Sequence, residues 1–148
     1  MSADVYPYWD VFVQKISYGN SYQRNIGLTL IAHNVKWDTQ VRFSVVFEQY
    51  LSHCQDEEFI TSRLAIQSIP LWVEFAPDLL IRTAEMLMGI DIVSLKDTQR
   101  KLILADILHA LLAIRCVKPQ ANIDAYIHQS LTGGLLDKKT IKEIKGLL

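Results

Sequence analysis

The 148-residue sequence contains only two cysteines, Cys54 and Cys116, and no long apolar run. The cysteines are far apart and lie in apolar segments, so we expect buried thiols rather than a disulfide framework. No apolar stretch approaches the roughly 18 residues that a membrane-spanning helix needs. The first residues, MSADVYPYWD, lack the basic segment and apolar stretch of a secretory signal. These absences predict a cytoplasmic protein with no membrane partner.

An excess of positive charge is also missing, because the formal net charge is −1. Nucleic-acid binders usually carry a basic surplus that neutralises phosphates, so a nucleic-acid partner is not expected. The charge is unevenly distributed. Residues 1–95 carry 6 basic and 11 acidic side chains (net −5), and residues 96–148 carry 9 and 5 (net +4). We therefore expect opposite charges on the two parts of the molecule.

Motifs that bring catalytic or metal-binding residues together are absent from the sequence. There is no H-E-x-x-H, G-x-S-x-G, P-loop or G-x-G-x-x-G pattern. The four histidines, His33, His53, His109 and His128, do not form a cluster with metal-ligand spacing. We predict that the protein is not an enzyme and has no catalytic residues, metal site or cofactor.

Apolar residues recur with helical spacing along nearly the whole chain. In the first helical segment the pattern comprises Val5, Tyr8, Trp9, Phe12, Val13 and Ile16. No segment shows the alternation of a half-buried strand. The spacing predicts an all-α fold with helices over about 5–16, 22–36, 39–54, 60–75, 77–88, 97–115, 119–131 and 138–148, with a kink at Pro70. Ser21, Asp38 and Asp137 are the expected N-caps.

If the predicted helices are taken in pairs, an arginine recurs near the start of the second helix of each of the first three pairs, at Arg24, Arg63 and Arg100. The intervals of 39 and 37 residues are typical of helix-pair repeats. The preceding turns supply a short amide or acid at Asn20, Asp56 and Asp97. We predict one domain over residues 1–148, with helix pairs over about 5–36, 39–75 and 77–115 and capping helices over 119–148. The three arginines are expected to be structural, tying turn acids or carbonyls between adjacent repeats. The alternative is coincidence among 15 basic residues.

The segments RNIGLTLIAHNVKWD and YLSHCQDEEFITSRLAIQSIP resemble those of the HEAT-repeat superfamily. They are most similar to small bacterial HEAT-like proteins, some of which carry the label "SufBD protein". The resemblance covers about residues 5–115 and implies a right-handed α-α superhelix of helix pairs. It implies no specific activity, and nothing in this helical sequence supports an iron–sulfur scaffold role.

Asp106 is a polar residue at a position where the other repeats have Leu30 and Ile69. A buried carboxylate needs a partner, so the structural interpretation is an ion pair with Arg63 or Arg100. The functional interpretation is a catalytic or base-contacting acid, as in HEAT-like alkylpurine DNA glycosylases. We favour the structural interpretation, because ion-pair networks also perturb carboxylates.

Positions +1, +5 and +9 from each arginine fall on one flank of each second helix. In HEAT-like arrays the second helices line the concave face, so the resemblance places this flank in a groove. The candidate binding residues there are Asn25, Thr29, His33, Ser68, Trp72, Lys101 and His109, together with Leu64 and Ala105. Ordinary helix surface is the competing interpretation, with Trp72 and Leu64 partly packed on neighbouring residues.

The favoured function is therefore a non-catalytic protein-interaction or scaffold module with a protein partner, an inference that rests on analogy between folds. A nucleic-acid-binding or glycosylase-like protein is one alternative, which requires Trp72 and Asp106 to be accessible. A structural subunit of an oligomer is the other. We also expect self-association, as a homodimer, because the first helix is rich in large apolar groups and the charges of the two parts are complementary.

Overall fold

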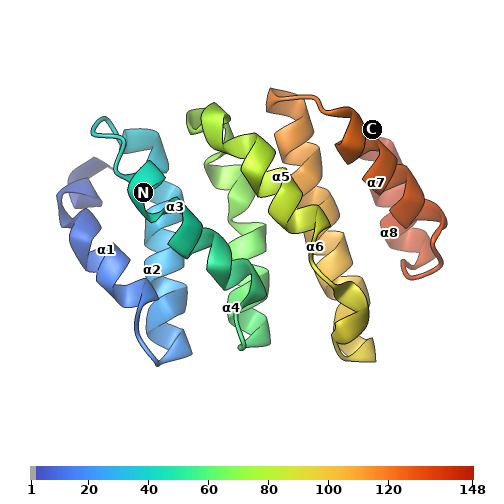
Figure 1. The fold of residues 1–148 in the computed structure, drawn as a ribbon, viewed down its shortest axis with the longest axis horizontal. Coiled ribbons are helices and arrows are strands. Elements are labelled where there is room, and N and C mark those ends of the chain that lie inside the picture. Colours follow the sequence, from blue (N-terminus) through green and yellow to red (C-terminus); the bar gives the residue numbers. More distant parts are fainter. Residues whose placement is uncertain (1–2) are drawn as a thin grey trace. The chain divides into compact units, whose positions relative to one another are not determined.

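The structure, a computed structural model, describes residues 3–148 and contains only helices and loops in that range (Figure 1). The α-helices are α1 (Trp9–Ile16), α2 (Ser21–Asn34), α3 (Phe43–Ser52), α4 (Phe59–Gln67), α5 (Leu80–Met88), α6 (Asp97–Val117), α7 (Ala121–Thr132) and α8 (Lys138–Leu147). Short 3₁₀ helices join several of them: η1 (Ala3–Tyr8), η2 (Val35–Trp37), η3 (His53–Gln55), η4 (Ile69–Leu71), η5 (Val73–Phe75), η6 (Pro77–Leu79) and η7 (Ile92–Ser94). The predicted all-α class is confirmed. Among the described helices, none is both long and apolar enough to cross a membrane.

The chain divides into two compact units, the first ending at Leu79 and the second beginning at Leu80. This boundary lies close to the predicted junction between the pairs over 39–75 and 77–115. The first unit holds α1 to α4, and the second holds α5 to α8.

In the first unit, α1 and α2 lie side by side, and α2 also contacts α4 (Figure 1). Gly27 allows the close approach of α1 and α2. A Cβ atom at this position would lie 2.8 Å from the backbone oxygen of Phe12 and equally close to atoms of Lys15 and Ile16. The missing side chain of Gly27 therefore sets the spacing of the first helix pair.

The core of the first unit is aromatic. Phe43 contacts Phe47, Tyr50 and Trp72 edge to face, with ring centroids 5.0–5.9 Å apart. The buried Tyr50 hydroxyl donates a hydrogen bond to the carbonyl oxygen of Ala65 in α4. This cluster joins α3 and α4 to the segment that follows α4.

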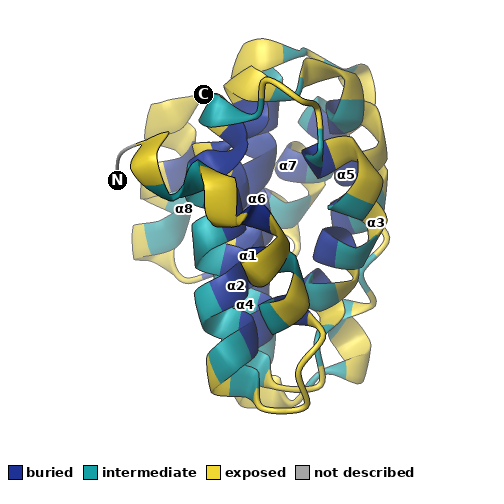
Figure 2. Ribbon diagram, turned by 90° about the vertical axis from the view of Figure 1, so that its left-hand side faces the viewer, coloured by how far each residue is buried: buried dark blue, intermediate teal, exposed yellow. Residues whose placement is uncertain are grey.

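The second unit is built around α6, which contacts α5, η7, α7 and α8. Its residues are buried on several sides, as the apolar composition of this segment predicted. The buried apolar side chains of α6 include Ile103, Leu104, Ile107, Leu108, Leu111, Leu112 and Ile114. Figure 2 colours the ribbon by burial and shows the buried stretch of this helix.

Several helix ends differ from the predicted ones. Asn20, rather than Ser21, is the N-cap of α2, and its side-chain oxygen accepts hydrogen bonds from the backbone N–H groups of Tyr22 and Gln23. Asp137 caps α8 as predicted, by accepting from the N–H of Thr140. The N-cap of α3 is Arg42 rather than the predicted Asp38, although the Asp38 carboxylate accepts the N–H groups of Arg42 and Phe43 and so stabilises the start of α3.

Pro70 ends the fourth helix instead of kinking it. The helix ends at Gln67, with a last backbone hydrogen bond from Ser68 to Leu64, and the chain continues through η4 and η5. Proline has no N–H to donate and its ring clashes with the preceding turn, which favours a change of direction over a continued helix. The helical register of α4 therefore does not determine which way the side chains after Gln67 point.

Candidate interaction groove

Arg24 has the structural role that its spacing predicted. Its guanidinium makes two hydrogen bonds to the Asp56 carboxylate, at 2.8 and 3.0 Å, and donates to the carbonyl oxygens of Tyr18 and Gly19 at 2.9 and 2.7 Å. The side chains of Arg24 and Asp56 are only 7% and 6% exposed. The arginine thus joins the turn before α2 to the turn before α4.

Asp56 is the centre of this buried cluster. His53 Nδ1 lies 2.8 Å from Asp56 Oδ2, and the backbone N–H of Glu58 donates to Asp56 Oδ1. Burial alone would raise the pKa of Asp56, but the hydrogen bonds from Arg24, His53 and Glu58, with the charge of Arg24, lower it below its usual value. The carboxylate therefore remains ionised and holds the two turns together.

Arg100 makes different contacts from those of Arg24. Arg100 donates to the carbonyl oxygens of Val93 and Leu95 and pairs with Asp97, so these bonds stay within its own turn. The Arg63 guanidinium lies 5.9 Å from the centre of the Phe59 ring. The predicted tie between adjacent repeats is thus seen for Arg24. Arg100 binds turn carbonyls and a turn acid, but only those of its own turn. For Arg63 the tie stays a prediction.

Asp106 is buried on α6, with 8% of its surface exposed. This agrees with the structural interpretation of the residue. The identity of its partner, expected to be Arg63 or Arg100, stays a prediction.

Two of the expected binding residues are not on an accessible surface. Trp72 is 0% exposed and its ring packs on Phe43, Phe47 and Tyr50. Ser68 is buried too, and its hydroxyl donates to the carbonyl oxygen of Leu64. The prediction is wrong for both residues because α4 ends at Gln67, so the +5 and +9 positions of this repeat turn into the core.

Lys101 and His109 belong to the second unit. Lys101 is exposed at the start of α6. His109 is partly exposed, with Nδ1 2.8 Å from the Ala105 carbonyl oxygen and Nε2 3.1 Å from the Glu143 carboxylate on α8. The described structure thus gives His109 a role in joining α6 to α8.

Asn25, Thr29 and Leu64 of the predicted residues lie at a groove between α2 and α4, which we call the α2/α4 groove. Two adjoining hollows of about 420 Å³ each form it. Its lining comprises Ser21, Tyr22, Asn25, Ile26, Thr29 and Leu30 on the α2 side and Glu58, Phe59, Ile60, Thr61 and Leu64 on the α4 side. Asn25, Thr29 and Leu64 of the predicted flank are in this lining, whereas His33, farther along α2, is not.

The α2/α4 groove is mainly apolar, with large side chains open to solvent at one end. Tyr22 and Ile60 are 69% and 72% exposed. The side-chain oxygen of Asn25 accepts a hydrogen bond of 2.6 Å from the Thr61 hydroxyl, which fixes α2 and α4 to each other beside the groove. A surface with exposed apolar groups on two joined helices is suited to binding a complementary surface.

The apolar part of the α2/α4 groove is not among the predicted binding residues. The predicted flank comprises +1, +5 and +9, but Ile26 and Leu30 occupy the neighbouring +2 and +6 positions, which the pattern assigns to the core. Tyr22 and Ile60 precede their repeat arginines by two and three residues. Their large apolar side chains in first turns, outside the core pattern, were the signal that could have identified the site.

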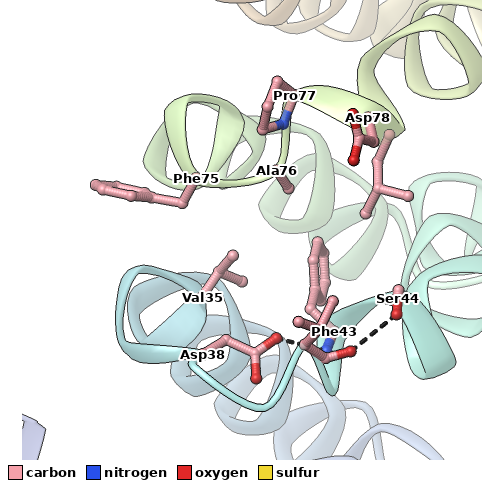
Figure 3. A pocket seen from close by; sticks show the side chains of 10 residues that line it. Val35, Asp38, Phe43, Ser44, Phe75, Ala76, Pro77 and Asp78 are labelled. Carbon is pink, nitrogen blue, oxygen red and sulfur yellow. Dashed lines mark hydrogen bonds between the residues drawn. The ribbon is translucent and has the colours of Figure 1, made fainter.

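A second and smaller hollow of about 170 Å³ lies between the segment 35–44 and the segment 75–79. Figure 3 shows Phe43 and Val35 near Ala76 and Pro77, with Asp38 to one side. Both carboxylate oxygens of Asp38 accept backbone N–H groups, and the Tyr6 hydroxyl donates to it as well. The acid is thereby engaged by backbone groups at the start of α3, so this hollow has a weaker claim to be a functional site.

The described residues contain no group of three or more His, Cys, Asp or Glu side chains that could hold a metal ion. Burial raises the pKa of the Cys54 thiol to about 12, so this cysteine stays protonated near neutral pH. The His53–Asp56 pair is occupied by Arg24 in a structural cluster. The α2/α4 groove is thus the surface with the best claim to a function. The chain matches no protein-family model, no curated protein and no solved structure in the comparisons.

Proposed function

We propose that the protein is a non-catalytic interaction module whose α2/α4 groove binds a segment of a partner protein. The observation that carries this proposal is the row of partly exposed apolar side chains between two helices joined by the Asn25–Thr61 hydrogen bond. Such surfaces on soluble proteins often mark binding sites, and a few apolar anchors at the centre of an interface dominate the affinity.

The arrangement of α2 and α4 supports the proposed HEAT-like architecture. Both are second helices of predicted pairs, and both line the same groove. In this proposal the pairs form a right-handed superhelix, and the α2/α4 groove belongs to the face that such proteins use for binding.

The glycosylase-like alternative requires accessible Trp72 and Asp106. Both residues are buried, with exposed fractions of 0% and 8%. No observation of the described residues favours this alternative over the interaction module.

The proposal can be tested by selecting peptides from a random library displayed on phage against the intact chain. We expect recovered peptides to carry apolar anchors. The variant Ile60→Ser with Leu64→Ser should weaken their binding at least about ten-fold, because each lost anchor contributes about 1–2 kcal/mol. Circular dichroism would verify that the variant is folded.

The matched control is Val45→Ser with Val11→Ser, which removes exposed apolar side chains from α3 and α1. This control should bind the selected peptides like the unaltered chain. If the peptides bind the groove variant and the control with equal affinity, the α2/α4 groove is not the binding site.

A further inference from the structure

We infer that the segment bound by the α2/α4 groove is a basic amphipathic helix, an inference that rests on the proposed function. It specifies the conformation and the charge of the partner.

The walls of the groove favour a helical occupant. Tyr22, Ile26 and Leu30 are spaced four residues apart along α2, and Ile60 and Leu64 repeat this spacing on α4. Apolar rows of this period accept the apolar stripe of another helix. The eight-residue span from Tyr22 to Leu30 corresponds to about 12 Å, which matches about two turns of a bound helix.

An extended segment would fit the same walls poorly. The backbone groups of α2 and α4 are hydrogen-bonded within the helices, so the groove offers no free strand edge to pair with. An extended chain in this apolar groove would leave its own N–H and C=O groups without partners. A helix satisfies those groups internally.

The charges at one end of the groove favour a basic partner. Glu57 and Glu58 are exposed in the turn before α4, and Glu58 is part of the lining. The charge of the nearby Arg24 is matched mainly by its ion pair with Asp56, and Glu57 and Glu58 add further negative charge beside it. The Arg63 cation lies against the Phe59 ring. Residues 1–79 carry 5 basic and 9 acidic side chains, a net charge of −4. Lysine or arginine beside the apolar stripe would therefore complement Glu57 and Glu58.

Asn25 adds a polar contact in the middle of the groove. Its side-chain oxygen is engaged by Thr61, so its NH₂ group is the part that can donate to a bound chain. An acceptor among the flanking residues of the helix, or a carbonyl at its end, suits this position.

The test uses two 14-residue amidated peptides with leucines at identical helix-period positions. All the remaining positions are lysine in one peptide and glutamate in the other. Isothermal titration of the intact chain with each peptide should show the lysine peptide binding at least about ten-fold tighter. The groove variant Ile60→Ser with Leu64→Ser should bind the lysine peptide more weakly than the unaltered chain does, by a similar factor.

Charge reversal tests the role of the acidic end directly. Glu57→Lys with Glu58→Lys should reduce or invert the preference for the lysine peptide. The control Glu74→Lys with Asp78→Lys makes the same change in net charge at exposed acids outside the groove and should preserve the preference.

Three results would overturn the inference: equal affinity for the two peptides, no binding of either one, or binding of the lysine peptide that the groove variant does not weaken. If phage-selected peptides still depend on Ile60 and Leu64, the proposed function survives while the inference about a basic helix fails. If the selected peptides bind the groove variant as tightly as the unaltered chain, the proposed function itself fails.

Discussion

At the scale of single residues, Arg24 joins the turn before α2 to Asp56, which lies 32 residues farther along the chain. Its side chain and that of Asp56 are both more than nine-tenths buried. Arg24→Ala would leave Asp56 as a buried carboxylate without its main partner, and such losses cost about 3–5 kcal/mol. We expect urea unfolding to show a decrease of this size in the free energy of unfolding.

The control for this prediction is Arg115→Ala. Arg115 pairs with Asp124 at 2.6 Å, but the two side chains are 34% and 45% exposed. Because solvent screens such pairs, Arg115→Ala should lower the free energy of unfolding by about 1 kcal/mol or less. Similar losses for Arg24→Ala and Arg115→Ala would show that the buried cluster has no special structural role.

The depressed pKa of Asp56 predicts a dependence of stability on pH. The folded state holds the pKa of this carboxyl below its unfolded value of about 3.9. Its stabilising contribution is therefore complete above that value and is lost as the pH falls through the folded pKa. The difference in unfolding free energy between the unaltered chain and Asp56→Asn should be large at pH 7 and should shrink below about pH 4. A difference that stays constant from pH 7 to pH 3 would contradict this assignment.

At the scale of helices, Gly27 determines how closely α1 and α2 approach. Alanine is the better helix former by about 1 kcal/mol. A Cβ at Gly27 would nevertheless lie 2.8 Å from the backbone oxygen of Phe12, which cannot move away without shifting α1. We expect Gly27→Ala to destabilise the protein by about 1–3 kcal/mol, as measured by its unfolding in urea.

Gly146 in α8 provides the comparison, because a Cβ there meets no atom within 4 Å. Gly146→Ala should leave the stability unchanged or raise it by up to about 1 kcal/mol. An increase in stability for Gly27→Ala as well would mean that the first helix pair is looser than its structure indicates.

Helical periodicity predicted where helices occur more reliably than where they end. The long α6 agrees with its predicted range because its apolar pattern and its first turn at Asp97 both define it. At Pro70 the apolar pattern continued through the proline, while the lost N–H and the ring changed the backbone. The helical pattern therefore predicts a surface position for Trp72, whereas this residue belongs to the aromatic core. Periodicity alone does not reveal such a change of direction.

At the scale of the whole molecule, the sequence established the all-α class and the flank of α2 that enters the groove. Asn25 and Thr29 were identified because a helix of known register fixes which residues share a face. Tyr22 and Ile60 were missed because their exposure depends on how α2 and α4 pack together. Packing of this kind depends on contacts between distant segments, such as Asn25 with Thr61, that no local pattern contains.

Self-association stays a prediction at this scale, and it rests less on the apolar side chains of the first helix than the sequence suggested. Trp9 and Phe12 of the first helix are buried, which leaves Tyr8 and Val11 as exposed apolar groups there. The opposite net charges of residues 1–95 and 96–148 remain the main reason to expect a dimer. Sedimentation velocity should show concentration-dependent association in 20 mM salt that weakens in 500 mM salt, because salt screens exposed charges. A monomer at all concentrations in low salt would refute the prediction.

The central claim is that the α2/α4 groove is the binding surface, and NMR titration of the ¹⁵N-labelled chain tests it most directly. A peptide selected on the intact chain would be added stepwise while the backbone amide signals of residues 3–148 are followed. The account predicts that the large shifts cluster at residues 21–30 and 58–64, which contain the groove lining. Shifts concentrated on α1 and α3, or on the helices of the second unit, with the groove amides unchanged, would contradict it.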